Sequence, residues 1–125
     1  MDTLDVAVIV AVQDAGRAKS RLAAHLDPGQ RHSLVKAMLD DLLTAVREVH
    51  TGLLVVVSPV SGYDAVAREH QAEVLRDPGI GYLPAVMLGL ARVANSGAAL
   101  VLPGDLPQAR GEDLAALLEA LRHAP

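Results

Sequence analysis

Three cations lie close together in a segment that follows the first apolar run of the chain. The segment is Gln13-Asp14-Ala15-Gly16-Arg17-Ala18-Lys19-Ser20-Arg21-Leu22, and Lys19 is one of only two lysines in the chain. An arginine offers a bidentate fork, and a lysine a compact charge, to the non-bridging oxygens of a polyphosphate. No Walker A string is present. Spacing alone leaves two alternatives open, a phosphate-binding loop and a solvated surface loop.

An acidic residue follows the last apolar run. Asp105 stands in the segment Pro103-Gly104-Asp105-Leu106-Pro107, where two prolines and a glycine restrict the backbone. Mg²⁺ in proteins usually takes one or two carboxylates together with substrate phosphates and water. Asp105 is therefore a candidate magnesium ligand. A cationic phosphate-binding loop opposite Asp105 would favour this role, because Mg²⁺ would then bind both the carboxylate and the phosphates. The alternative is an aspartate that only forms a turn.

A third segment combines two glycines with the start of an expected helix. It is Arg76-Asp77-Pro78-Gly79-Ile80-Gly81-Tyr82-Leu83. Glycines allow a backbone to approach a ligand closely, and a helix N-terminus favours anions. This pattern indicates either a ligand-binding loop or a plain turn.

Alternating strands and helices must position these loops. Continuous apolar runs rich in β-branched residues are typical of strands buried on both faces, and a shorter run resembles them. The expected strands are residues 6–12, 53–58, 72–75 and 98–102. Apolar rows at spacings of three and four, with capping residues at their ends, predict helices. The expected helices are residues 28–49, 63–71, 83–94 and 112–123.

This order predicts an α/β fold, with a mainly parallel sheet between helices in a Rossmann-like three-layer arrangement. We found no repeat or linker, so residues 1–125 are expected to form a single domain. Ligands of such sheets bind outside the carboxyl ends of the strands, where the strand order reverses. The segments expected there are 13–22, 58–62, 76–83 and 103–108.

Composition excludes several classes of function. The 125 residues are 51% hydrophobic and 21% charged, a globular balance, and the formal charge of −4 disfavours nucleic acid as a partner. Absence of cysteine excludes disulfides and thiolate metal sites. No apolar run approaches the roughly 20 residues of a membrane span, and the acidic N-terminus lacks signal-peptide character, so we expect a cytoplasmic protein. The five histidines show no metal-ligand spacing, and we interpret them as surface residues.

Taken together, the segments resemble the 2-phospho-L-lactate or phosphoenolpyruvate guanylyltransferases of coenzyme F-420 biosynthesis. These enzymes are nucleotidyltransferases with a glycosyltransferase-A-type fold. The Lys-Ser-Arg-Leu and Gly-Asp-Leu-Pro elements are the most specific parts of the resemblance, which follows the family's order along the whole chain. The matching stretches are residues 8–12, 18–22, 37–43, 55–59, 72–79 and 101–107.

The resemblance implies transfer of GMP from GTP to a phosphorylated three-carbon acid, either 2-phospho-L-lactate or phosphoenolpyruvate, with release of pyrophosphate and a requirement for Mg²⁺. Lys19 and Arg21 would be catalytic, stabilising the triphosphate and the charge on the leaving pyrophosphate. Asp105 would hold the metal. The implied nucleotide-binding residues are Val12, Arg17, Lys19, Arg21, Asp77, Pro78, Gly79 and Gly81.

The chain departs from the family pattern in three ways. Gln13 stands where the family usually has a lysine, and Pro84 where it usually has an asparagine. Family members are also longer, and their second half carries the acceptor-binding groups and a second metal-binding aspartate, so the fold is expected to be truncated. The alternatives are therefore a nucleotide-binding module without transferase activity and a related nucleotidyltransferase with another acceptor. Without the strands of the family's second half, the strand 98–102 has an open edge, which predicts either self-association into a homo-oligomer or only marginal stability.

Overall fold

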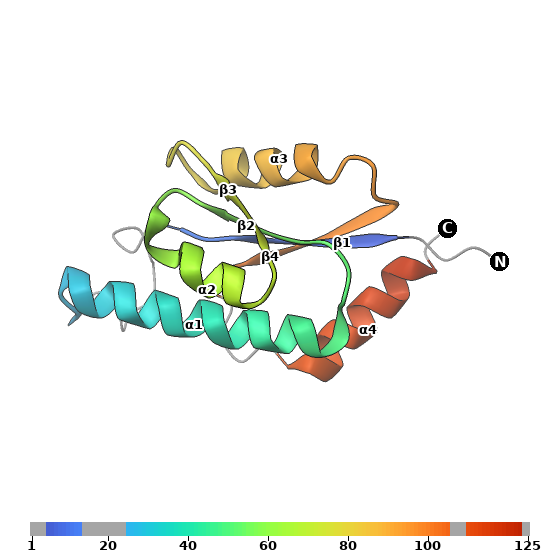
Figure 1. The fold of residues 1–125 in the computed structure, drawn as a ribbon, viewed down its shortest axis with the longest axis horizontal. Coiled ribbons are helices and arrows are strands. Elements are labelled where there is room, and N and C mark those ends of the chain that lie inside the picture. The colour runs from blue at the N-terminus through green and yellow to red at the C-terminus, as the bar shows by residue number, and fades with distance from the viewer. Residues whose placement is uncertain (1–4, 14–24, 106–109, 124–125) are drawn as a thin grey trace.

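The expected strands and helices alternate along the chain (Figure 1). A computed structural model describes residues 5–13, 25–105 and 110–123. The strands are β1 (Val6–Ala11), β2 (Leu54–Ser58), β3 (Glu73–Arg76) and β4 (Ala98–Pro103). The helices are α1 (Pro28–Val49), α2 (Asp64–Glu69), α3 (Tyr82–Arg92) and α4 (Gly111–Arg122), and a short 3₁₀ turn, η3 (Ser61–Tyr63), precedes α2.

All strand pairs are parallel, in the order β3-β2-β1-β4. The chain moves from β1 outward to β2 and β3 and then returns with β4 on the other side of β1. The strand order therefore reverses between β1 and β4, which run in register from Val6 beside Ala98 to Ala11 beside Pro103. Because ligands of such sheets bind beside the reversal, the segments that follow β1 and β4 lie at the expected ligand edge.

Helices cover both faces of the sheet, with α1, α2 and α4 on one face and α3 on the other (Figure 1). Alternate residues of β1 point to the two faces. Val8 and Val10 pack in a core with Leu39 of α1 and Leu118 of α4, whereas Ile9 packs in a second core beneath α3. Every residue of β1 is buried, as expected of a central parallel strand. The predicted three-layer α/β fold is confirmed.

One edge of the sheet is formed by β4, which is mostly half-buried. Among the described residues, β4 pairs only with β1. Self-association through this edge stays a prediction, because nothing in the structure tests it. No helix in the described ranges is both long enough and apolar enough to cross a membrane.

Arg47, near the end of α1, ties together the connections that lead into β2 and β3. Its guanidinium donates hydrogen bonds to four backbone carbonyl oxygens: those of His50 (3.1 Å) and Gly52 (2.9 Å), before β2, and those of His70 (2.6 Å) and Gln71 (2.9 Å), before β3. Burial lowers the pKa of Arg47. This cluster lies at the amino ends of the strands, opposite the ligand edge.

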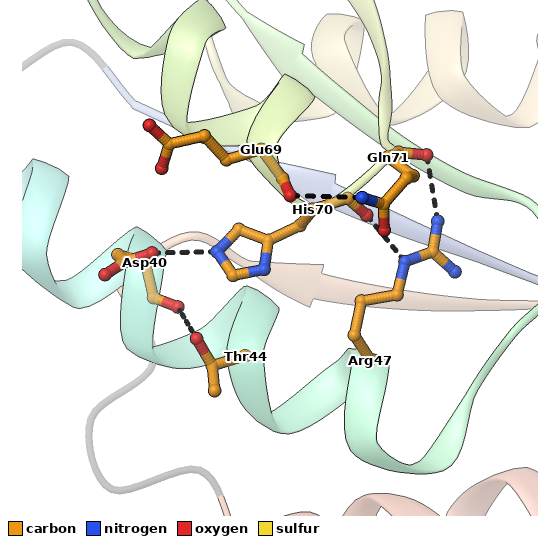
Figure 2. A network of polar contacts seen from close by, with 6 residues as sticks. All are labelled: Asp40, Thr44, Arg47, Glu69, His70 and Gln71. Carbon is orange, nitrogen blue, oxygen red and sulfur yellow. Dashed lines mark hydrogen bonds and ion pairs between the residues drawn. The ribbon is translucent and has the colours of Figure 1, made fainter.

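The same region holds two of the histidines. Figure 2 shows the imidazole of His70 facing Asp40 of α1, with 2.7 Å between Nε2 and Oδ1. The expectation that all five histidines lie on the surface is wrong for His50, which is only 3% exposed. Its Nε2 lies 2.9 Å from the carbonyl oxygen of Leu53, and this local contact satisfies the buried ring.

Candidate functional site

Asp105 lies at the end of β4, where that strand runs beside the exit of β1. The backbone N–H of Gly104 donates a hydrogen bond of 2.8 Å to the carbonyl oxygen of Ala11. A Cβ atom on Gly104 would lie 3.1 Å from Cγ2 and 3.2 Å from Cα of Val12, so only glycine fits this close approach without a shift. The Gly-Asp pair therefore places the Asp105 carboxylate beside the strand reversal.

Val12 has a structural role at the same point. Its side chain is buried in the core, and its backbone N–H donates to the carbonyl oxygen of Val57 of β2 at 2.8 Å. A nucleotide contact from Val12 would therefore involve its backbone. The other predicted residues of the first loop, Arg17, Lys19 and Arg21, lie outside the described residues, so their roles stay predictions.

The third predicted loop begins with a buried carboxylate. Asp77 directly follows β3 and is 5% exposed, and its backbone N–H donates to the carbonyl oxygen of Ser58 at 3.2 Å. Its Oδ1 accepts a hydrogen bond of 2.6 Å from the backbone N–H of Gly79. Its Oδ2 is also buried and has no hydrogen-bond partner among the described residues. A buried, unpaired carboxylate oxygen is costly, and a ligand that donates a hydrogen bond would remove that cost.

The two glycines of this loop occupy conformations that other residues avoid. Gly79 has φ +75° and Gly81 has φ +137°. Gly81 is the N-cap residue of α3 and supplies no side-chain cap, so the first N–H groups of α3 receive no acceptor from it. Pro78, between the carboxylate and the first glycine, is exposed. The loop thus presents backbone donors and one buried carboxylate at the ligand edge.

Tyr82, the first residue of α3, lies in the third predicted segment but is not among the site residues that the sequence interpretation named. Burial raises the pKa of its hydroxyl, and the negative charge of Asp105 raises that pKa further. Helix α3, which begins with Tyr82, packs against β1 and β2, the two strands that lie between β3 and β4 in the sheet. Tyr82 therefore lies at the same edge of the sheet as Asp77 and Asp105, which follow the two outer strands. A usable sequence signal was present, since Tyr82 is one of only two tyrosines and directly follows the two glycines.

The donor chemistry at Asp105 suits magnesium. Within the ranges that the structure describes, no group of three or more His, Cys, Asp or Glu side chains could hold a metal ion. Asp105 is a half-buried carboxylate there. Mg²⁺ is commonly coordinated by one protein carboxylate, with substrate phosphates and water as its other ligands. Asp105 as a single carboxylate ligand is consistent with this coordination.

Comparisons with known proteins find relatives that match most of this chain. The family model for the MobA-like NTP transferase domain matches residues 8–125. The phosphoenolpyruvate guanylyltransferase of Rubrobacter xylanophilus is 38% identical over 124 residues, which cover 98% of this chain and 60% of the relative. The 3-phospho-D-glycerate guanylyltransferase of Phenylobacterium zucineum is 38% identical over 121 residues, covering 91% and 56%. A phosphoenolpyruvate guanylyltransferase of Mycobacterium leprae is 35% identical over 128 residues, covering 97% and 59%.

The chain thus spans about 60% of the length of these curated relatives. The predicted resemblance to guanylyltransferases is confirmed by the names of these relatives, and the family match extends over most of the described fold, including the strand reversal with Asp105 and the loop with Asp77. The chain belongs to the MobA-like NTP transferase domain family.

Proposed function

We propose that this chain is the nucleotide-binding part of a guanylyltransferase that transfers GMP from GTP to a phosphorylated three-carbon acid. The names of the relatives support this class of acceptor, since phosphoenolpyruvate and 3-phospho-D-glycerate are both phosphorylated three-carbon acids. 2-Phospho-L-lactate belongs to the same class, and the proposal includes a place in coenzyme F-420 biosynthesis. The observation that carries the proposal is the buried Asp77 carboxylate at the ligand edge, with one oxygen unpaired among the described residues.

In the proposed reaction, a phosphate oxygen of the acceptor attacks the α-phosphorus of GTP. The bond between the α-phosphorus and the bridging oxygen to the β-phosphate breaks, and pyrophosphate leaves with that electron pair. The acceptor phosphate is already anionic, so the step needs no strong base. Catalysis then rests on positioning and electrostatic stabilisation.

Each proposed residue has one task in this step. Lys19 and Arg21 bind the triphosphate and stabilise the charge that develops on the leaving pyrophosphate. Asp105 holds Mg²⁺, which when bound neutralises charge on the phosphate oxygens. Asp77 accepts a hydrogen bond from the nucleoside through Oδ2, while the loop around Gly79 and Gly81 lies against the nucleoside.

Replacing Asp77 by asparagine tests the nucleotide site. The amide oxygen of the new side chain can still accept from the N–H of Gly79, whereas an NH₂ donor replaces the acceptor Oδ2. The new NH₂ group would then face a hydrogen-bond donor of the nucleoside. Asp77→Asn should therefore weaken binding of Mg·GTP by about tenfold or more, because a hydrogen bond to a charged group contributes roughly 1.5–3 kcal/mol. Calorimetric titration with GTP measures the change.

Asp41→Asn is the matched control, because Asp41 is an exposed carboxylate in the middle of α1, away from the ligand edge. It makes the same change of charge and should leave the affinity for GTP unchanged. Equal affinities for the wild type and Asp77→Asn would show that Asp77 serves only to form the turn with Gly79.

Nucleotide binding without transfer is the second candidate function, and Pro84 favours it. Pro84 lies in the first turn of α3, where the missing N–H of proline costs no helical hydrogen bond. The fold therefore tolerates proline at a position where the resemblance implies an asparagine, but proline has no polar side chain to offer a ligand. GTP binding without pyrophosphate release in the presence of phosphoenolpyruvate, 3-phospho-D-glycerate or 2-phospho-L-lactate would support this second function.

A further inference from the structure

Tyr82 differs from the other tyrosine of the chain in its surroundings. Tyr63 is fully buried and stacks on the ring of His32, with 4.7 Å between ring centroids. Tyr82 is 38% exposed, and its hydroxyl makes no hydrogen bond to any residue in the part of the chain that the structure describes. The phenol of Tyr82 is therefore an accessible donor that this part of the fold leaves unused.

The fold places this donor at the ligand edge. Helix α3 packs against β1 and β2 and begins at the edge where the strands end, as Figure 1 shows. The loop 77–81 joins Tyr82 to Asp77, and the field of Asp105 reaches the phenol from the end of β4. Since β1 and β2 lie between β3 and β4, Tyr82 begins α3 between the strand that leads to Asp77 and the strand that leads to Asp105.

The order of groups in a nucleoside triphosphate, from nucleoside to phosphates, matches the order of Asp77, Tyr82 and Asp105 along the site. In the proposed function Asp77 contacts the nucleoside and Asp105 holds the metal bound to phosphates. The part of GTP between those two groups is the ribose and the α-phosphate, and both carry oxygens that accept hydrogen bonds. The exposed phenol of Tyr82, at the start of α3 and over the strands between Asp77 and Asp105, is placed to reach that part of the ligand.

We propose that Tyr82 is a further nucleotide-binding residue whose hydroxyl donates a hydrogen bond to an oxygen of the ribose or the α-phosphate of Mg·GTP. The inference rests on the proposed function, because it needs GTP to lie between Asp77 and Asp105. It adds a contact on the side of the site formed by α3. A donor at this position also suits the anionic α-phosphate, since the first turn of α3 favours negative charge.

Calorimetric titration with Mg·GTP of the wild type, Tyr82→Phe and Tyr82→Ala tests this contact. Phenylalanine keeps the ring and removes only the hydroxyl, so Tyr82→Phe should weaken binding about three- to tenfold, as expected for one hydrogen bond. Met87→Ala is the matched control, because Met87 is 57% exposed on the same helix and carries no donor. It should bind GTP as the wild type does.

A second ligand identifies the acceptor. With 2′,3′-dideoxy-GTP, the difference between wild type and Tyr82→Phe should vanish if the acceptor is a ribose hydroxyl and persist if it is the ribose ring oxygen or an α-phosphate oxygen. A merely structural role of Tyr82 would not make the effect depend on the ribose hydroxyls. Thermal unfolding of each variant verifies that the fold is kept.

The remaining outcomes overturn the proposal in distinguishable ways. Equal affinity of wild type and Tyr82→Phe for both ligands shows that the hydroxyl makes no contact. A loss in Tyr82→Ala without a loss in Tyr82→Phe assigns the contact to the ring instead. Failure of the wild type itself to bind Mg·GTP contradicts the proposed function, and the Tyr82 contact falls with it.

Discussion

Replacing both Lys19 and Arg21 by alanine should weaken binding of Mg·GTP by about a hundredfold or more. Each side chain is proposed to make charge-assisted hydrogen bonds to the triphosphate, and each such bond contributes roughly 1.5–3 kcal/mol. Both residues lie outside the described residues, so the prediction rests on the sequence pattern and its resemblance to guanylyltransferases. Titration calorimetry of the double variant against the wild type measures the loss.

The double variant Lys36→Ala with Arg68→Ala is its matched control. Lys36 is the other lysine of the chain, and both control residues are exposed on helices and make the same change of net charge. This control should bind GTP nearly as the wild type does. Equal losses in the two double variants would indicate only a general effect of charge, and no loss in either would remove the first loop from the phosphate site.

Arg47→Ala should lower the free energy of unfolding by about 2–4 kcal/mol, the largest stability effect that we expect. One guanidinium donates to four carbonyl oxygens on two connections, so its loss releases the end of α1, the entry to β2 and the entry to β3 together. Water can replace some of these hydrogen bonds because the side chain is partly exposed, which limits the loss. Urea unfolding followed by far-ultraviolet circular dichroism suits a chain without tryptophan.

Two control variants test whether the loss of stability comes from the hydrogen bonds of Arg47. Arg92 of α3 forms an exposed ion pair with Glu73 of β3, and Arg92→Ala should change stability little because exposed pairs are solvated and screened. Arg47→Lys keeps the charge, but one ammonium has only three donors and cannot serve four carbonyls, so most of the loss should remain. If Arg47→Ala is as stable as Arg92→Ala, the arginine does not hold the connections together.

Local sequence signals predicted α1 in full. Asp27 and Gln30, on either side of Pro28, have the spacing of a capping box, and the structure shows both reciprocal hydrogen bonds, at 2.7 and 3.0 Å. The strands were predictable for a similar reason, since a run such as that of β1 is apolar at every position. Capping and apolar periodicity depend on neighbours within a few residues, so the sequence alone contains them.

Contacts between distant segments could not be predicted in this way. Nothing near His50 in the sequence indicates that it is buried, because its burial follows from packing at the end of α1 before β2. The four hydrogen bonds of Arg47 likewise join it to residues as many as 24 positions away. Such contacts depend on how the helices and strands pack, which helix and strand patterns do not specify.

In the candidate site, too, some features follow from the local sequence and others depend on contacts between distant segments. The positions of Asp77 and Asp105 at one edge of the sheet were predictable, because each follows an apolar run and the carboxyl ends of parallel strands share one edge. The position of Tyr82 between the strands that lead to Asp77 and Asp105 required the strand order β3-β2-β1-β4 and the packing of α3 on β1 and β2. The burial of the Asp77 carboxylate likewise could not be predicted, because it depends on the packing of this loop against Ser58 at the end of β2.

Titration of the wild type and Asp105→Asn with GTP, with and without Mg²⁺, tests most directly that the strand reversal forms a metal-dependent nucleotide site. Asparagine keeps the shape of the side chain and removes the charge that a hard dication prefers. Mg²⁺ should raise the affinity of the wild type for GTP and leave that of Asp105→Asn unchanged, while both proteins unfold at similar temperatures. If Mg²⁺ raises the affinity of Asp105→Asn as much as that of the wild type, Asp105 is a turn residue and the proposed metal site is wrong.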